Sequence, residues 1–269
     1  YLASLRIDQA HDWKSFRDAC CYSNIPALNM VWADRHGIIG WQVVGIVPIR
    51  KNWSGLVPVS GDGRYEWNGY LPIKERPHIS NPSKGFWATA NNNLVPPGYQ
   101  HRNAIGWVWA DPYRANRVTE VLDSGRRHSM ADMIQLQTDY LSIPARQLVP
   151  LLKNVKSDNW MTEQARMALL NWDYTLTKDS VAAGIYVAWE RCLMANTVAL
   201  FVPQKARKVI RSVPTATMIG WLIAPPVEFG ENPVTGRDDF LIKSLEEAVE
   251  GLTERFGTDM IDWLYGQNR

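Results

Sequence analysis

The most constraining feature of this 269-residue sequence is the stretch 26–50, which reads PALNMVWADRHGIIGWQVVGIVPIR. Two apolar runs rich in Val, Ile and Trp flank the polar turn Asp34–Gly37, an arrangement typical of a β-hairpin. Two polar residues stand out in it. Asn29 begins the first strand, and Arg50 follows the second strand just beyond Pro48. The stretch therefore predicts a sheet with polar side chains at its margin.

The composition is that of an ordinary globular protein and limits the range of partners. Hydrophobic residues make up 46% of the chain and charged residues 21%, which is far from the composition of disordered proteins. The 29 basic and 27 acidic residues leave a net charge of +2. A charge this small creates no long-range field that attracts nucleic acid or an anionic membrane surface. We therefore expect neither nucleic acid nor a membrane among the partners.

The common motifs for catalysis and metal binding do not occur in the sequence. The five histidines stand in no metal-ligand spacing, and there is no HExxH, GxSxG, GxxxxGK[ST] or strand-following GxGxxG. The three cysteines, Cys20, Cys21 and Cys192, include two chain neighbours and form no CxxC. They predict neither a disulfide framework nor a zinc site. A motif search therefore assigns no chemistry.

The chain changes character part-way along its length. Residues 1–112 contain short β-like runs separated by Gly and Pro, among them the segment 85–92, and one early helix around 11–22. Over 113–269 the spacing of apolar residues becomes mainly helical. The sequence therefore predicts the α+β class, with 1–269 as one unit whose first part is mainly sheet-forming and whose second part is mainly helical.

Local signals predict two helices of the second part. A capping box at Ser129–Asp132 begins a helix that we expect to end near Pro144. An apolar stripe over 240–256 lies opposite a row of glutamates, and Gly257 is placed to end that helix. Both segments are therefore predicted to bury one face.

The most apolar stretch of the chain is Val181–Val202. It carries Glu190 and Arg191 at its middle, and charged side chains are costly at the centre of a bilayer. We therefore predict a buried helix here and not a membrane span.

Strand geometry brings the polar residues of the hairpin together. If a four-residue turn pairs Ala33 with Ile38, Asn29 lies opposite Gln42, and directly opposed residues point to the same face of the sheet. Arg50 has the same parity. A buried amide beside a cation needs partners that offset its desolvation. The alternative is structural: Asn29 ties down a neighbouring loop, and Arg50 anchors an ion pair.

Thirteen tryptophans leave room for functions other than catalysis. Trp32, Trp41, Trp107 and Trp109 lie within apolar runs, so we expect them to pack in the core. A non-catalytic binding or scaffolding module, for example one for glycans, would instead present an exposed row of tryptophans. A helical interaction domain over residues 113–256 would present a large exposed apolar patch.

An ordered series of short segments resembles a known family. The hairpin region contributes Leu28-Asn29, Ala33-Asp34, Gly37-Ile-Ile-Gly40, Gly45 and Pro48-Ile-Arg50. Further segments follow in the same order: Pro58-Val-Ser-Gly61, Trp67-Asn-Gly69, Asn81-Pro82, Gly85 with Thr89-Ala-Asn-Asn92, Tyr113-Arg114, Arg117-Val118, Asp132-Met133, Gln137, Asp139, Leu169-Leu-Asn-Trp-Asp173, Asp179-Ser180 and Ala182-Ala183. The series is similar to the β subunit of penicillin acylases (penicillin amidases), which are N-terminal nucleophile hydrolases.

The resemblance implies a fold and a reaction. The fold is a four-layer αββα sandwich, of which this chain is a part with a helical C-terminal portion. The reaction is hydrolysis of the amide between an acyl chain and an amine, as in a β-lactam antibiotic such as penicillin or in an N-acyl homoserine lactone. In this family the first residue of the β subunit, usually serine, attacks the carbonyl, and its own α-amino group accepts the proton.

The resemblance also implies roles for two residues. Asn29 matches the family asparagine whose side-chain NH₂ donates to the oxyanion beside a backbone N–H. Arg50 matches the family arginine, which we expect to orient the asparagine and the α-amino group. These two residues are the catalytic candidates of this chain, and the sequence assigns no substrate-binding residues.

In the family pattern, Tyr1 corresponds to a point after the nucleophile. The chain is therefore expected to be one part of a processed enzyme and to lack the nucleophile. Its expected partners are the α subunit, the nucleophile-bearing N-terminal part of the β subunit, and a small-molecule amide. The resemblance implies export to the periplasm or secretion, no cofactor for the chemistry, and a possible structural calcium without an assignable ligand set.

Overall fold

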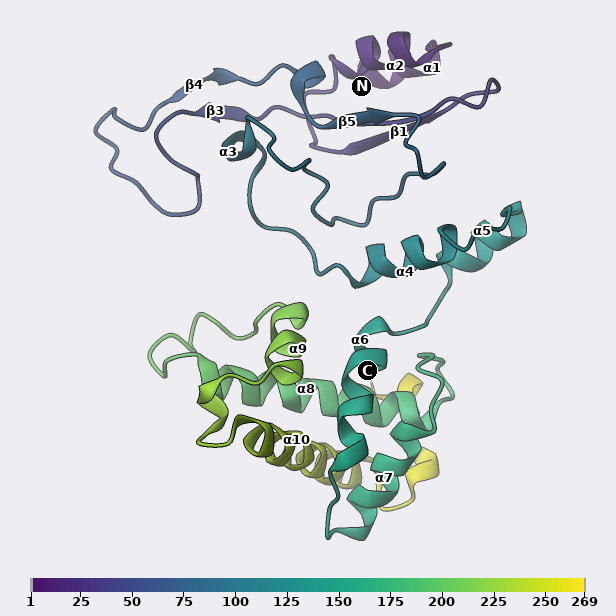
Figure 1. Ribbon diagram of the computed structural model, residues 1–269, viewed down its shortest axis with the longest axis vertical. Helices are drawn as coiled ribbons and strands as arrows, with labels where there is room; N and C mark the ends of the chain where they lie inside the picture. Colours follow the sequence, from purple (N-terminus) through teal and green to yellow (C-terminus); the bar gives the residue numbers. More distant parts are fainter. Residues whose placement is uncertain (1, 269) are drawn as a thin grey trace. The chain divides into compact units, whose positions relative to one another are not determined.

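The computed structural model describes residues 2–268 and divides them into two compact units (Figure 1). The N-terminal unit comprises the chain up to Ala110 together with Val118–Arg126. The C-terminal unit comprises Asp111–Arg117 and the chain from Arg127 onward. Strands lie in the first unit and the long helices in the second, so the α+β class is confirmed.

The N-terminal unit contains two small antiparallel sheets. One has the strand order β1-β2-β5, and the other consists of β3 and β4. Its elements are α1 (Leu2–Asp8), α2 (Trp13–Cys20), β1 (Asn29–Ala33), β2 (Ile39–Val43), β3 (Pro48–Arg50), β4 (Trp67–Tyr70), the 3₁₀ turn η1 (Ile73–Glu75), β5 (His78–Ser80) and α3 (Arg102–Ile105).

The predicted hairpin is confirmed, but its turn is longer than expected. Ala33 lies opposite Ile39 and not opposite Ile38. The Asp34 N–H donates to Ile38 O at 3.0 Å, and Gly37 adopts a φ of +84°. A turn followed by a glycine with positive φ adds one bulged residue to a hairpin loop. The loop therefore shifts the register by one residue.

This shift changes which side chains share a face of the sheet. Asn29 lies opposite Val43, and Gln42 lies opposite Met30. Because successive residues of a strand point to opposite faces, Asn29 shares its face with Trp41, and Gln42 lies on the other face. The prediction that Asn29 and Gln42 point to the same side was therefore wrong.

Helix α2 packs on the Gln42 face of the sheet. Gln42 is fully buried, its Oε1 accepts from Arg17 Nε at 2.8 Å, and its Nε2 donates to Ile73 O at 2.9 Å. Phe16 and Val44 belong to the small apolar core between the helix and the sheet. The other face of this sheet thus remains for the Asn29 side chain and its neighbours.

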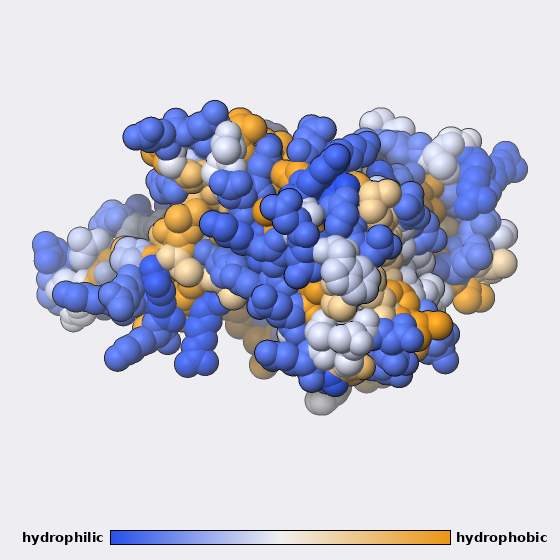
Figure 2. All heavy atoms as spheres, turned by 90° about the horizontal axis from the view of Figure 1, so that it is seen from below, coloured by the Kyte–Doolittle hydropathy of each residue, from blue (hydrophilic) through white to orange (hydrophobic). Residues whose placement is uncertain are grey.

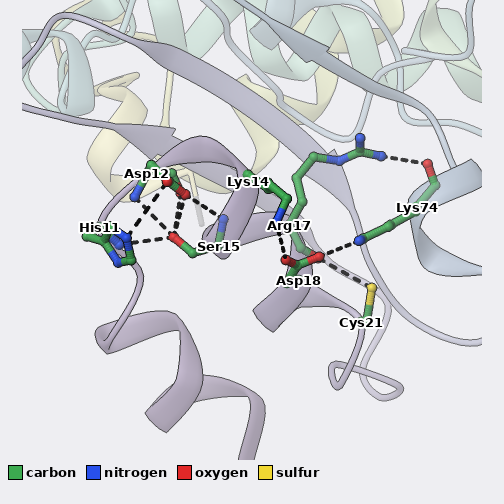
Figure 3. A network of polar contacts seen from close by, with 8 residues as sticks. All are labelled: His11, Asp12, Lys14, Ser15, Arg17, Asp18, Cys21 and Lys74. Carbon is green, nitrogen blue, oxygen red and sulfur yellow. Dashed lines mark hydrogen bonds and ion pairs between the residues drawn. The ribbon is translucent and has the colours of Figure 1, made fainter.

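A polar network fastens α2 to the turn that follows the second sheet (Figure 3). Arg17 Nη2 donates to Lys74 O at 2.6 Å, and the Lys74 ammonium pairs with the Asp18 carboxylate. This pairing lowers the pKa of Asp18 and raises that of Lys74. These contacts hold η1 against α2. They thereby also fix the start of the segment that leads from η1 into β5.

The N-terminal unit agrees with some of the predicted elements and differs from others. The early helix is confirmed as α2, with Asp12 as its N-cap, and α1 precedes it unexpectedly. The segment 85–92 forms no strand. Trp41 is buried and Trp32 half-buried, but Trp107 and Trp109 are 41% and 37% exposed, so the core prediction for these two was wrong. Their segment is irregular backbone without the partner strands that bury alternate side chains.

The C-terminal unit is a helical bundle (Figure 1). Its elements are α5 (Met130–Gln137), α6 (Ile143–Leu148), η2 (Val149–Asn154), α7 (Trp160–Leu170), α8 (Val181–Phe201), α9 (Thr215–Ile223), η3 (Val227–Phe229), α10 (Pro233–Phe256), η4 (Met260–Asp262) and η5 (Tyr265–Gln267). Helix α4 (Tyr113–Leu122) is divided between the two units.

Two of the local helix signals acted as predicted and one did not. Ser129 forms the capping box that begins α5, and Gly257, at a φ of +87°, follows the last residue of α10. However, α5 ends at Gln137. Pro144 lies instead in the first turn of α6, which Ser142 caps. Proline is well tolerated there because its missing N–H has no acceptor in a first turn.

Helix α8 forms the centre of the core, as its apolar sequence predicted. Trp189 and Leu193 are fully buried in it, and the Trp189 Nε1 donates to Leu241 O in α10 at 3.1 Å. Gly184 is required where the chain end approaches, because a Cβ there would lie 2.0 Å from Trp263 O. Over residues 2–268, no helix has the length and apolarity needed to cross a bilayer.

Replacing Glu190 with glutamine is expected to raise the stability at pH 7. Burial raises the pKa of Glu190, whose Oε1 accepts from the Tyr186 hydroxyl at 2.8 Å. The folded protein then binds the proton more tightly than the unfolded chain, so stability falls as pH rises through the raised pKa. Glutamine keeps the acceptor without the charge. We expect a gain in Tm of about 2–4 °C, the shift that 1 kcal/mol produces.

Thermal unfolding at two pH values checks this prediction. The gain should be present at pH 7 and should disappear as the pH falls below the ordinary glutamate pKa of about 4.3, because Glu190 then becomes protonated in both states. Glu254→Gln, which changes an exposed carboxylate of α10, serves as the matched control and should leave Tm unchanged. An equal gain at both pH values would contradict the role of the buried charge.

Candidate active site

A pocket of about 340 Å³ opens in the N-terminal unit on the Asn29 face of the β1-β2-β5 sheet. Four parts of the chain build it: the segment entering β1, the strand β2, the segment between η1 and β5, and the stretch that runs from before α3 to beyond its end. Its wall residues are Ala27, Leu28, Asn29, Trp41, Val43, Arg76, Pro77, Asn91, Asn92, Leu94, Val95, Ile105, Val108, Trp109 and Ala110. The wall is mostly apolar, with a few amide and cationic groups.

The side chain of Asn29 is oriented by the neighbouring strand. Trp41 Nε1 donates to Asn29 Oδ1 at 2.9 Å. Trp41 is itself fixed, because it is 1% exposed and its ring lies 5.0 Å from the ring of Trp87. An indole N–H is only a donor, so the carboxamide must present its oxygen to it. The Nδ2 amide group of Asn29 is thereby left to donate elsewhere.

The start of β1 is held close to the end of β2. The Val44 N–H donates to Leu28 O at 2.9 Å, and the Gly45 N–H donates to Ser23 O at 2.9 Å. Gly45 has a φ of +104°, and a Cβ there would lie 2.6 Å from the Cα of Ala27. Glycine is therefore required at this position, both for its backbone angle and for the close approach.

Arg50 occupies a different place from the one expected. It ends β3 in the two-stranded sheet, where it pairs with Trp67, and it is not a wall residue of the pocket. Its Nη1 donates to Asn103 O at 2.8 Å, and its guanidinium lies 5.3 Å from the ring centre of Trp53. The structure thus brings Arg50 to helix α3 and does not bring it into contact with Asn29.

Arg50 is nevertheless connected to the pocket wall, because it donates a hydrogen bond to a residue of α3. Asn103 belongs to this helix, and Ile105 at its end is a wall residue. The Nε of Arg50 is buried without a partner, and a Cβ at Gly55 would lie 3.0 Å from it. No carboxylate pairs with Arg50 among the ion pairs of the described residues, so the alternative of a structural ion pair is not supported.

Arg76 is a wall residue that the sequence did not single out. It is 3% exposed, and its Nη1 donates to the carbonyl oxygens of Val44 and Gly45. Burial lowers the pKa of Arg76 to about 10. In the sequence it is one of four charged or polar residues around Pro77, and no periodicity indicates that its side chain turns inward.

Asparagines supply further polar groups of the wall. Asn92 Oδ1 accepts from the Ala90 N–H at 3.1 Å, and Asn91 O accepts from the Ala110 N–H at 3.0 Å. Asn91 adopts a φ of +62°, which asparagine tolerates better than most residues. The bond from Ala110 to Asn91 fastens the segment around 91 to the segment around 110, and both segments line the pocket.

Side chains of the four common metal-ligating types are not clustered in the described part of the chain. Within residues 2–268, no group of three or more His, Cys, Asp or Glu side chains could hold a metal ion. The structural calcium that the resemblance implies therefore finds no such ligand cluster in this part of the chain. Cys20, Cys21 and Cys192 are all free thiols.

The sequence is similar to that of known acylases. The family profile described as penicillin amidase matches residues 1–269. The chain is 28% identical to the acyl-homoserine lactone acylase QuiP of Pseudomonas aeruginosa over 89% of this chain and 31% of the relative. It is 22% identical to penicillin G acylase of Escherichia coli over 95% of this chain and 34% of the relative. The chain thus spans about a third of the length of these relatives.

The structural comparison shows the fold. A thermostable penicillin G acylase from Alcaligenes faecalis superimposes with a TM-score of 0.77 at 22% identity, covering 97% of this chain and 53% of that chain. The fold is therefore the N-terminal nucleophile hydrolase type, as the resemblance implied. Because the profile spans every residue and the fold agrees, the chain belongs to the penicillin amidase family.

Proposed function

We propose that this chain is part of an amidohydrolase that cleaves the amide between an acyl chain and an amine. The nucleophile is an N-terminal serine outside this chain, and the amide is that of a β-lactam such as penicillin or of an N-acyl homoserine lactone. The proposal is supported by the family and by relatives named as acyl-homoserine lactone acylases and penicillin acylases. The remaining chains of a processed, exported enzyme are its partners.

One observation carries the proposal for this chain: the orientation of the Asn29 carboxamide. Trp41 Nε1 donates a hydrogen bond to the carboxamide oxygen at 2.9 Å, so the two Nδ2 hydrogens are the groups that can donate into the pocket. An oxyanion needs donors that are fixed before the reaction, because donors that must reorient during it stabilise the transition state less. A side-chain amide locked by an indole meets this requirement.

The reaction then proceeds in two steps. The serine hydroxyl attacks the amide carbonyl, its α-amino group accepts the hydroxyl proton and passes it to the leaving amine, and an acyl ester remains. Water next attacks the ester and releases the acid, and the serine regains its proton. A negative oxygen forms in both steps, and Asn29 Nδ2 donates to it each time.

Arg50 takes the role of a positioning residue in this proposal. It holds α3 through Asn103 O, and α3 carries the wall residue Ile105. Arg50→Lys is expected to lower kcat clearly, because a lysine lacks the planar guanidinium that stacks on Trp53 while it donates to the carbonyl. Steady-state kinetics measure the effect, with Arg64→Lys, an exposed site of the same unit, as the control. An unchanged rate would reduce Arg50 to a purely structural residue.

Assays of the processed protein test the function itself. Penicillin G and a medium-chain N-acyl homoserine lactone are offered, and release of the free amine is measured. Intact mass spectrometry of the same sample should find companion chains, one of which begins with serine. Absence of hydrolysis of any acyl amide, or full activity from a sample of the mass of this chain alone, would overturn the proposal.

A binding module is the second candidate, favoured by the exposure of some aromatic residues. Trp67 and Tyr70 of β4 are 55% and 56% exposed, and their rings lie 6.3 Å apart. Titration with oligosaccharides while tryptophan fluorescence is followed separates this candidate from the hydrolase. A helical interaction domain would need a large exposed apolar patch, and on the face in Figure 2 hydrophilic residues dominate and hydrophobic ones form only separate patches.

A further inference from the structure

Arg76 lines the Asn29 pocket, and its cationic side chain is buried. Its Nη1 donates to two backbone carbonyls, but its Nε is buried and has no acceptor in the described part of the chain. No carboxylate contributes to its electrostatic surroundings, and burial dominates the lowering of its pKa. A buried charge without a counter-ion is costly. Such a group is therefore suited to receive an anion.

The other wall groups favour the same kind of ligand. Besides Arg76, the polar side chains of the described wall are the carboxamides of Asn29, Asn91 and Asn92, and none of its residues is acidic. The remaining wall residues are apolar, with Trp41 and Trp109 as the largest. The pocket thus combines a positive charge with hydrocarbon surface, which fits a molecule that has both an anionic group and an apolar body.

We propose that Arg76 binds a carboxylate on the amine part of the substrate and so selects acylated amino-acid-like amines over uncharged ones. The inference rests on the proposed function, because it places the scissile amide at Asn29 in the same pocket. The amine part of an N-acyl amino acid carries a carboxylate next to the amide nitrogen, and that of an acylated β-lactam nucleus carries one on the opposite side of its fused rings. A homoserine lactone has a neutral ring at this place.

The expected size of the preference follows from the type of contact. Hydrogen bonds to charged groups contribute about 1.5–3 kcal/mol, which corresponds to about 10- to 100-fold in affinity. Arginine suits the task because its fork can hold both oxygens of a carboxylate. The preference should therefore appear in Kd and KM.

A matched pair of ligands isolates the charge. An N-acyl glycine and the corresponding N-acyl glycinamide share the acyl chain and the amide, and only the first carries a carboxylate. Calorimetric titration of the processed protein carrying Asn29→Ala, which slows turnover, measures the two Kd values. We expect the glycine compound to bind about 10- to 100-fold more tightly. Adding Arg76→Met should bring the ratio near one, and Arg76→Lys should keep part of it.

A nearby arginine provides the control. The guanidinium of Arg102 lies 4.7 Å from the ring centre of Trp107 and 5.9 Å from that of the wall residue Trp109, yet Arg102 does not line the pocket. Arg102→Met removes an equal charge close by and should keep the preference. A ratio of two affinities in one sample does not depend on the fraction of folded protein, so it remains informative if Arg76→Met loosens the bend at Val44.

Three results would overturn the inference. These are equal affinities for the two ligands in the parent protein, a preference that survives Arg76→Met, and a preference that disappears equally in Arg102→Met. If the preference survives Arg76→Met and the Tm of that variant falls, Arg76 is a structural residue whose counter-ion comes from another part of the protein and not from the ligand. Failure of the proposed function is distinct, because it appears as absence of hydrolysis by the protein with Asn29 intact, while the binding preference is measured without turnover.

Discussion

Replacing Asn29 with alanine is expected to lower kcat by about 10²–10³, the loss found when one oxyanion donor is removed. The Nδ2 group donates to the negative oxygen in both steps of the proposed reaction. Its hydrogen bond to the neutral carbonyl of the bound substrate is weaker than its bond to that oxyanion. The loss should therefore appear in kcat more than in KM. Initial-rate kinetics on an acyl amide, together with Tm as a check of folding, measure the effect.

Two further variants separate the donor from the acceptor of Asn29. Asn29→Asp keeps an oxygen for the Trp41 N–H but replaces the donor with an anion, so it should lose at least as much activity as alanine. Trp41→Phe keeps Asn29 but removes the indole N–H that orients it. We expect it to lose about fivefold, since one hydrogen bond contributes roughly 1 kcal/mol. Asn52→Ala, an exposed amide of the same unit, is the control, and near-normal turnover of Asn29→Ala would remove Asn29 from the mechanism.

Replacing Trp189 with alanine is expected to lower the free energy of unfolding by about 3–5 kcal/mol. The side chain is fully buried at the centre of the C-terminal unit, and its N–H donates to Leu241 O at 3.1 Å. The variant leaves a cavity and also leaves this carbonyl without its donor. Urea denaturation followed by circular dichroism measures the loss.

The control for this variant is another tryptophan of the same unit. Trp160 begins α7 and is 69% exposed, so Trp160→Ala should change the free energy of unfolding by no more than about 0.5 kcal/mol. Trp189→Phe keeps most of the volume and should lie between the two. Similar losses in Trp189→Ala and Trp160→Ala would show that α8 is not the centre of this core.

Helices α2, α5, α8 and α10 were predicted from the sequence, and the start of α5 and the end of α10 were found because capping signals are local. Asp12 and Ser129 accept hydrogen bonds from N–H groups three residues further on, and Gly257 follows its helix in a backbone conformation that other residues disfavour. The end of α5 was misjudged for a related reason. Pro144 was taken to stop one helix, but proline also fits the first turn of the next one, and Ser142 makes that second option available.

The faces of the hairpin could not be assigned from local sequence signals alone. Its strands and its turn were predicted, but a single bulged residue at Gly37 moved Gln42 to the opposite face from Asn29. Alternation of side chains makes every assignment of a face depend on such a residue. Trp107 and Trp109 were misassigned for a comparable reason, because an apolar run is buried only if other segments cover it.

The sequence by itself determined the family, the class of fold, the start of α5, the end of α10, and Asn29 as the candidate donor. Only the tertiary structure decided that Trp41 fixes the Asn29 amide, that Arg50 reaches α3 and not Asn29, and that Arg76 lies buried in the pocket wall. The reason is physical. Caps and turns depend on groups a few residues apart, whereas the direction and burial of a long side chain depend on segments that the chain brings together only when it folds.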